Sequence, residues 1–128
     1  MLKEIDCPCT QGRLYRDCCQ PYHNYTKHPN DAEQLMRSRY SAYALNLTSY
    51  IIKTWDPTTC PYLSSNHMHD IQWLKLIVNR SWEDKSTHEA YVDFDAFYEQ
   101  DGQMHRMHEI SRFIKTNENW LYIDGRVS

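Results

Sequence analysis

Four cysteines within the first nineteen residues carry the clearest chemistry of the chain. They form two close pairs, Cys7 with Cys9 and Cys18 with Cys19, separated by residues 10–17. Two such pairs can surround one tetrahedral Zn²⁺ with ligands that all come from one short loop. A site closed by four thiolates has no open position for a substrate. The pattern therefore predicts a structural zinc site and does not identify a reaction.

A disulfide arrangement is the main alternative to zinc. Cys7 and Cys9 are too close in sequence for a relaxed bridge, and a bridge between Cys18 and Cys19 would be strained, whereas bridges between the two pairs stay open. Residues 1–6 are charged and lack the apolar core of a secretory signal peptide. We therefore expect a cytoplasmic protein with reduced thiols, which favours zinc. A redox sensor that uses Cys18 and Cys19 is a third interpretation.

Other cysteine and histidine side chains give weaker metal signals. His23 could substitute as a ligand, although a position beside the ligands is favoured. Cys60 stands alone and is expected to be a buried or half-buried free thiol. The remaining histidines do not form a set with metal-ligand spacing, so we expect no second metal site. The closest are two pairs, His67 with His69 and His105 with His108.

Composition indicates one globular domain. The chain has 128 residues, of which 41% are hydrophobic and 13% aromatic. That is enough for a hydrophobic core and argues against disorder. The net charge of −3 does not favour a general nucleic-acid-binding surface. The apolar runs are too short for a transmembrane helix, so we expect no membrane association.

The order of patterns along the chain predicts two modules. Residues 1–28 form a metal knuckle, and residues 29–128 form an α+β body. The body begins with a helix that Asp31 caps, with Gln34 completing a capping-box-like pair. Its apolar stripe has helical spacing and comprises Leu35, Met36, Tyr40, Tyr43 and Leu47. A second short helix is expected over 49–55, capped by Thr48, before a loop over 58–66 and a helical turn over 67–72.

The period then changes from helical to alternating. Leu74, Leu76 and Val78 are expected on one face of a first strand. A second strand has its own apolar face, formed by Val92, Phe94, Ala96 and Tyr98. Asp101-Gly102 predicts a hairpin turn into a third strand over 105–115, and a turn at 117–119 leads into a fourth over 120–123. Helices followed by an antiparallel meander predict a curved sheet with helices packed on one face.

Several sequence blocks resemble known families. The stretch from Cys7-Pro-Cys9 to Cys18-Cys19, followed by Pro21-Tyr22-His23, resembles the SEC-C zinc motif. Four later blocks, over 32–44, 55–58, 108–113 and 120–125, resemble the YchJ-like bacterial family. The resemblance runs through essentially the whole chain in order. One departure is local, because the family usually has Gly-Ser-Gly after the second cysteine, where this chain has Thr10-Gln11-Gly12.

The resemblance implies an N-terminal zinc knuckle on an NTF2-like body. An NTF2-like body is a cone, in which a strongly bent antiparallel sheet wraps around helices and leaves a pocket. The related SEC-C motif in the tail of the bacterial preprotein-translocase motor ATPase serves partner recognition, and the analogy suggests the same here.

The inside of the cone is the second candidate site. Its candidate residues are charged and aromatic side chains of the helices and the third strand: Arg37, Arg39, Tyr40, Tyr43, Trp55, His108, Glu109 and Arg112. Strand alternation places Glu109 on the face opposite His108 and Arg112, so Glu109 and Arg112 cannot both face the pocket without a bulge. The cluster could bind a small molecule, with Glu109 or His108 as a general acid or base. The alternative is a packed aromatic core with a helix-to-sheet ion pair at its edge.

Two functions follow from these sites. The favoured one is a non-enzymatic zinc-binding module whose knuckle docks a cytosolic protein or a ribosome-associated partner. The alternative is a small-molecule-binding protein or enzyme that uses the cone pocket. The sequence has no nucleophile triad, phosphate-binding loop or nucleotide fingerprint that would indicate a reaction class.

Overall fold

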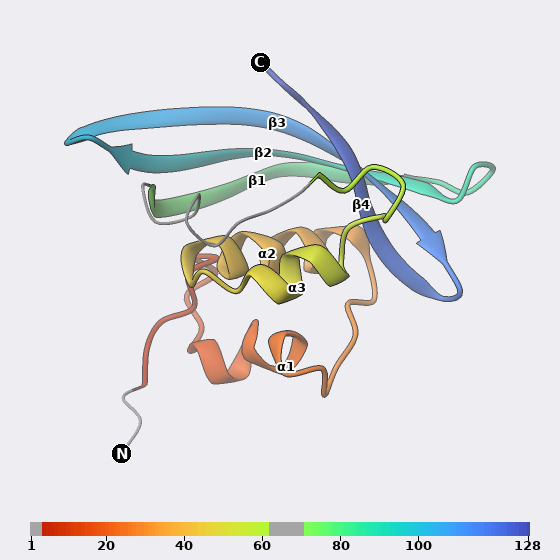
Figure 1. Ribbon diagram of the computed structural model, residues 1–128, viewed down its shortest axis with the longest axis horizontal. Coiled ribbons are helices and arrows are strands. Elements are labelled where there is room, and N and C mark those ends of the chain that lie inside the picture. The colour runs from red at the N-terminus through yellow and green to blue at the C-terminus, as the bar shows by residue number, and fades with distance from the viewer. Residues whose placement is uncertain (1–3, 62–70) are drawn as a thin grey trace.

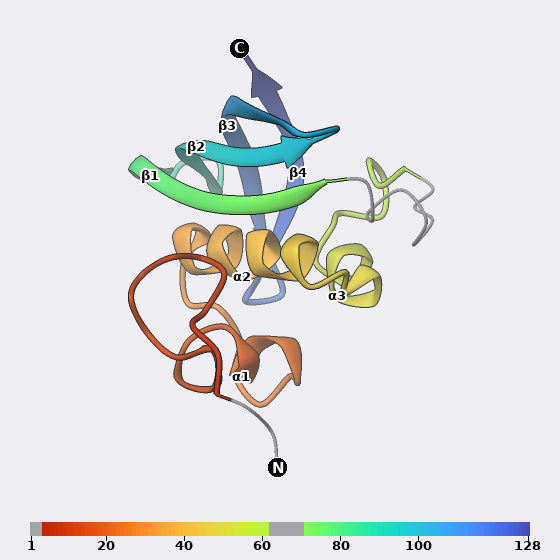
Figure 2. The same ribbon diagram turned by 90° about the vertical axis from the view of Figure 1, so that its left-hand side faces the viewer.

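The computed structural model describes residues 4–61 and 71–128. A four-stranded antiparallel sheet, a pair of helices and the knuckle lie in successive layers (Figures 1 and 2). The helix α2 (Ala32–Ala44) lies in the middle layer, with the sheet on one side and the knuckle on the other. The predicted α+β architecture, a knuckle followed by helices on a curved meander, is confirmed.

α2 begins as the sequence predicts. The Asp31 carboxylate accepts a hydrogen bond of 2.8 Å from the backbone N–H of Gln34. The Gln34 side chain accepts in turn from the N–H of Asn30, one residue before the cap, at 2.9 Å. Leu35 and Tyr40 of the predicted stripe are buried, and the Tyr40 ring meets Trp73 of the sheet edge to face. The opposite face of α2 is buried as well, because the knuckle and the next helix cover it.

The second helix differs slightly from the prediction. α3 spans Thr48–Lys53, and its N-cap position is Leu47 rather than Thr48. It ends before Trp55 because the backbone there pairs with the sheet. The N–H of Tyr122 donates to the carbonyl of Thr54, and the N–H of Asp56 donates to the carbonyl of Tyr122, both at 2.8 Å. Of the expected helical turn at 67–72, residues 67–70 lie outside the described residues, and Gln72 begins the first strand.

The sheet has the order β1-β2-β3-β4, with each strand antiparallel to the next. All strands are longer than the patterns predict: β1 Gln72–Asp84, β2 Glu89–Gln100, β3 Gln103–Thr116 and β4 Asn119–Val127. Asp101 and Gly102 form the predicted tight turn, both with positive φ, at 54° and 76°. The hairpin of β3 and β4 bends toward the helices (Figure 1). The Trp120 indole fastens it there by donating to the Asn30 carbonyl at 3.3 Å.

One residue of the predicted face of the first strand, Leu74, was placed wrongly. The pairing of β1 with β2 shifts between Trp73 and Lys75. This bulge turns Leu74 outward, where it is exposed, and lets Trp73 pack against the core. Leu76 is buried as expected. A bulge reverses the alternation locally, which a strict two-residue period cannot anticipate.

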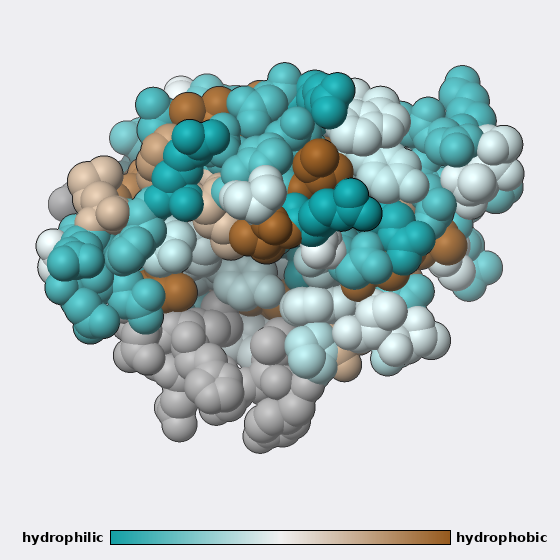
Figure 3. All heavy atoms as spheres, turned by 90° about the horizontal axis from the view of Figure 1, so that it is seen from above, coloured by the Kyte–Doolittle hydropathy of each residue, from teal (hydrophilic) through white to brown (hydrophobic). Residues whose placement is uncertain are grey.

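The larger of two hydrophobic clusters in the described residues runs from the sheet through α2 into the knuckle. It contains Val92, Phe94 and Phe113 of the sheet, Leu35 of α2, and Cys9 of the knuckle. The outward face of the sheet is mainly hydrophilic (Figure 3). Within the residues that the structure describes, no helix is long and apolar enough to cross a membrane.

Candidate metal centre and cone cavity

The four cysteine sulfurs converge on one point. All four Sγ atoms lie within 4.8 Å of one another, and Cys9 and Cys18 are 3.5 Å apart. Zinc–sulfur bonds of about 2.3 Å in a tetrahedron require sulfur separations of about 3.8 Å, so the cluster is the right size. All four cysteines are free thiols, and Cys7, Cys9 and Cys19 are buried. These residues could hold a metal ion.

A small hairpin brings the first pair of cysteines into place. The N–H of Cys7 donates to the Arg13 carbonyl, and the N–H of Tyr15 donates to the Ile5 carbonyl, both at 2.8 Å. Thr10 follows the pair at φ 61°, in the left-handed region that favours glycine. Its hydroxyl donates to the Leu76 carbonyl at 2.9 Å and lies 3.2 Å from the Leu76 nitrogen. The departure from the glycine of the family thus adds a contact between the knuckle and the edge strand β1.

The second pair is placed by two short helices. The 3-10 helix η1 spans Tyr15–Asp17, and α1 spans Gln20–His23, so Cys18 and Cys19 form the corner between them. The Cys18 N–H donates to the Tyr15 carbonyl at 3.1 Å.

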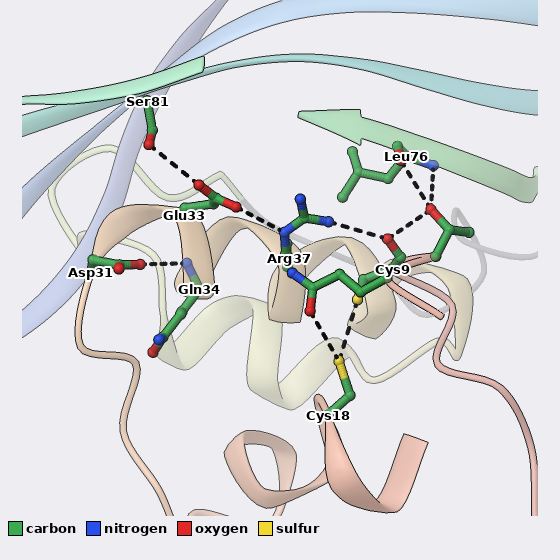
Figure 4. A network of polar contacts seen from close by, with 10 residues as sticks. Cys9, Cys18, Asp31, Glu33, Gln34, Arg37, Leu76 and Ser81 are labelled. Carbon is green, nitrogen blue, oxygen red and sulfur yellow. Dashed lines mark hydrogen bonds and ion pairs between the residues drawn. The ribbon is translucent and has the colours of Figure 1, made fainter. Parts of the chain in front are cut away.

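Side chains of α2 surround the cluster. The Ser41 hydroxyl donates to Cys19 Sγ at 3.3 Å and lies 3.5 Å from Cys7 Sγ. Arg37 reaches from the Glu33 carboxylate, at 3.1 Å, toward the Cys9 carbonyl, at 3.4 Å (Figure 4). Partners of this kind orient metal ligands and support their charge.

His23 lies beside the cluster and is already occupied by other partners. One ring nitrogen lies 2.6 Å from the Tyr15 hydroxyl and the other lies 2.8 Å from the Ser38 carbonyl. The ring also meets Tyr50 edge to face. His23 therefore ties the knuckle to α2 and α3 rather than completing the cysteine cluster.

Thiols so close together resist simultaneous ionisation. Burial, followed by the neighbouring Cys9 thiol, raises the pKa of Cys18 to about 12. Hydrogen bonds from Cys19 and then Cys9 lower the pKa of Cys7. A bound divalent cation removes this conflict, because it replaces the protons as the positive charge among the sulfurs.

The cone encloses a cavity of about 310 Å³ that is partly open to solvent. Five of the eight predicted pocket residues line it: Arg39, Tyr40, Tyr43, Trp55 and Glu109. The other lining residues are Met36, Trp73, Phe94, Met107, Ser111, Phe113 and Tyr122.

Three predicted pocket residues lie elsewhere. Arg37 lies on the knuckle side of α2, because the helix turns its side chain away from the sheet. His108 and Arg112 point to the outer face of the sheet, where His108 Nε2 lies 2.6 Å from the Asp93 carboxylate. Arg112 donates there to Glu89 and Asp124, both at 2.9 Å. Strand alternation is the reason: the pattern placed these two residues opposite Glu109, and the structure shows that the Glu109 face meets the cavity.

Arg39 is the buried charge of the cavity. Its guanidinium lies over two rings that meet edge to face, 4.9 Å from the Trp55 centroid and 4.5 Å from that of Tyr122. Its Nη1 donates to the Ile51 carbonyl at 2.9 Å and to the Thr54 hydroxyl at 2.7 Å. Burial lowers its pKa from the ordinary value. These contacts support the cation at a depth where an isolated charge is costly.

Glu109 enters the cavity from the sheet. Its carboxylate accepts hydrogen bonds from Ser111 and, at 3.4 Å, from the Tyr122 hydroxyl. Gly125 on β4 leaves room for it, since a Cβ built there would overlap the carboxylate.

Comparisons with known proteins agree with this architecture. The family described as "YchJ, middle NTF2-like domain" matches residues 31–125. A UPF0225 protein of Bordetella pertussis is 42% identical over 124 residues, which cover 94% of this chain and 92% of the relative. The chain belongs to the YchJ-like family.

Two solved structures of SEC-C motif containing proteins extend the likeness to the knuckle. The solution structure from Rhodopseudomonas palustris has a TM-score of 0.85 at 33% identity, covering 95% of this chain and 98% of that one. The crystal structure from Psychrobacter arcticus has a TM-score of 0.80 at 32% identity, covering 95% and 82%. Both relationships support the predicted combination of a SEC-C segment with an NTF2-like body.

Some cavity residues of this YchJ-like chain were not predicted from the sequence. Regular alternation predicts Leu74 in the core, whereas the bulge in β1 brings Trp73 there instead. Tyr122 lies directly before a register shift between β3 and β4, and the regular pairing from the turn places it opposite Phe113. Ser111 and Phe113 line the cavity because strand alternation puts them on the same face as Glu109.

Histidines form no second metal cluster in the described part of the chain, where the four cysteines are the only such group. His105 stacks on Tyr98 with the ring centroids 5.1 Å apart. His67 and His69 lie outside the described residues. Cys60 is half-buried, as expected.

Proposed function

We propose that the four cysteines bind one Zn²⁺ and that the ion is structural. The convergence of four thiol sulfurs within 4.8 Å carries this proposal. Four thiolates in tetrahedral arrangement favour zinc over hard cations such as Mg²⁺ or Ca²⁺. The ion would order a segment that is too small to fold alone and hold it on α2.

The second part of the proposal is that the ordered knuckle docks a protein partner, in the cytoplasm and without catalysis. A patch of three residues beside the knuckle supports it: Tyr25, Ile52 and Lys53. Tyr25 and Ile52 are each 44% exposed. Lys53 Nζ lies 4.8 Å from the Tyr25 centroid, so the patch combines apolar surface with one positive charge. Exposed aromatic and aliphatic groups of this kind are common at interfaces, and a ribosome-associated protein is one candidate partner.

Native mass spectrometry with and without a chelator tests the metal. We expect one zinc per chain in the purified protein and its slow removal by the chelator. Circular dichroism should then show lost tertiary structure, because Cys9 and Cys19 belong to the same cluster as Leu35 of α2. A metal-free protein whose mass is lower by two or four hydrogens would instead indicate disulfides and overturn the zinc proposal. Zinc release by peroxide at low concentration would favour a redox sensor.

A photo-crosslinking side chain placed at Tyr25 tests the docking patch. The matched control is the same side chain at Met104, which is 70% exposed at the far end of the sheet. We expect Tyr25 to crosslink to one defined protein and Met104 not to do so. The crosslink should be lost when Cys18→Ser weakens the zinc site. Its persistence in the zinc-free variant, or equal labelling from Met104, would contradict the docking proposal.

A further inference from the structure

The cone cavity contains a buried cation, Arg39, that no carboxylate of the described residues contacts. Arg39 is 5% exposed and forms no ion pair with any carboxylate of residues 4–61 and 71–128. Its hydrogen bonds to the Ile51 carbonyl and the Thr54 hydroxyl both start from Nη1, and it also forms a side-chain hydrogen bond with Tyr43. A guanidinium has five N–H donors, so donors remain for a further acceptor. Two aromatic rings hold the guanidinium in place, so its direction is set before anything enters.

Two further polar groups in the cavity wall also have no partner. In the described part of the chain, the Trp55 Nε1 and the Tyr40 hydroxyl are buried without a hydrogen bond. Buried polar atoms are nearly always paired, so each exception calls for an explanation. The indole N–H is a donor only, as is the guanidinium beside it. Both require an acceptor, which a carboxylate would supply.

A negative group faces this donor set from the opposite wall. Glu109 comes from β3, whereas Arg39 comes from α2, and Tyr122 touches both. The Glu109 carboxylate is held by Ser111 and Tyr122 and can still accept a hydrogen bond. The cavity thus presents one positive and one negative group within walls of apolar and aromatic side chains.

We propose that the cavity binds a small zwitterion with an apolar body, such as an amino acid. Its carboxylate pairs with Arg39 and the Trp55 indole, and its ammonium pairs with Glu109. A monoanion would leave Glu109 unpaired, and a monocation would leave Arg39 unpaired, each in a low-dielectric site. The apolar body lies against Trp73, Phe94 and Met107. A volume of about 310 Å³ is at the small end of the range for ligand pockets, about 300–1,000 Å³.

Three probes with the same aromatic ring separate the charge requirements. They are L-phenylalanine, a zwitterion; 3-phenylpropionate, an anion; and phenethylamine, a cation. Binding is measured by NMR titration of the metal-loaded protein, following the Trp55 indole N–H, which Trp55→Phe identifies. We expect L-phenylalanine to bind at least about tenfold more tightly than either other probe, and to shift this resonance.

Variants test the assigned contacts. Glu109→Gln should reduce the advantage of L-phenylalanine over 3-phenylpropionate to about twofold or less. Gly125→Ala should do the same, because the added methyl displaces the carboxylate. His108→Gln, on the opposite face of β3, is the matched control and should leave all affinities unchanged. Equal binding of the anion and the zwitterion to the unmodified protein, or no binding of any probe, would overturn the proposal whether or not the variants fold.

Discussion

Two serines of α2, Ser38 and Ser41, are completely buried and yet differ in what they contact. The Ser38 hydroxyl donates to the Leu35 carbonyl and lies 2.8 Å from the Tyr50 hydroxyl. The Ser41 hydroxyl instead faces the sulfurs of Cys19 and Cys7. Composition does not distinguish them, because their roles follow from which turn of the helix meets the knuckle.

The pair therefore offers an internal comparison for the metal site. We expect Ser41→Ala to weaken zinc binding by about 10–100-fold, since a hydrogen bond to the ligand sulfurs is lost. Ser38→Ala should reduce stability but leave zinc affinity nearly unchanged, as its hydroxyl does not touch a cysteine. Competition with a chromophoric chelator measures both affinities. An equal loss in the two variants would mean that Ser41 acts only through packing.

At the scale of elements, α2 is the part on which both candidate sites depend. It carries Arg39 into the cone cavity and Ser41 toward the cysteines. A helix that is buried on both sides has no clearly polar, exposed face. The apolar stripe therefore predicted only the contact of α2 with the sheet. The start of α2 is defined by the Asp31 cap and by the hydrogen bond from Asn30 to Gln34.

The cap provides a direct test of how α2 is anchored. Asp31→Ala should lower the free energy of unfolding by about 1 kcal/mol, because the N–H of Gln34 loses its acceptor. Asp31→Asn keeps an acceptor at the same place and should change stability by only a few tenths of that amount. Urea unfolding measures both variants. Similar destabilisation by Ala and Asn would show that the charge of Asp31, and not the cap, is what matters.

At the scale of the whole molecule, His23 joins the layers. It lies between Tyr15 of the knuckle, the Ser38 carbonyl of α2 and the ring of Tyr50 in α3. Burial lowers its pKa below the ordinary value. The folded protein therefore keeps this imidazole neutral at a pH where the unfolded chain already protonates it.

This difference makes stability depend on pH in a defined direction. Below the ordinary histidine pKa of about 6.5 the unfolded state binds the extra proton, so the free energy of unfolding falls as the pH falls. We expect the unmodified protein to lose more stability between pH 7.5 and pH 5.5 than the His23→Gln variant does. His88→Asn, at an exposed turn, is the control and should follow the unmodified protein. Urea unfolding at both pH values measures the free energy of unfolding of each protein. Equal losses of stability in all three proteins would exclude His23 as the source of the pH dependence.

The cysteine cluster, the α2 cap, the order of helices and strands, and the position of Glu109 on the strand face opposite His108 and Arg112 could be predicted from the sequence. These features depend on local spacing, which a short stretch of chain specifies. The tertiary structure alone decided that Trp73 rather than Leu74 enters the core, and that Arg37 lies with the knuckle while Arg39 lines the cavity. It also decided that α3 ends early, because the backbone of Tyr122 forms hydrogen bonds with Thr54 and Asp56 on either side of Trp55. Bulges, helix rotation and pairing between distant segments depend on how whole elements pack, and spacing along the chain does not encode them locally.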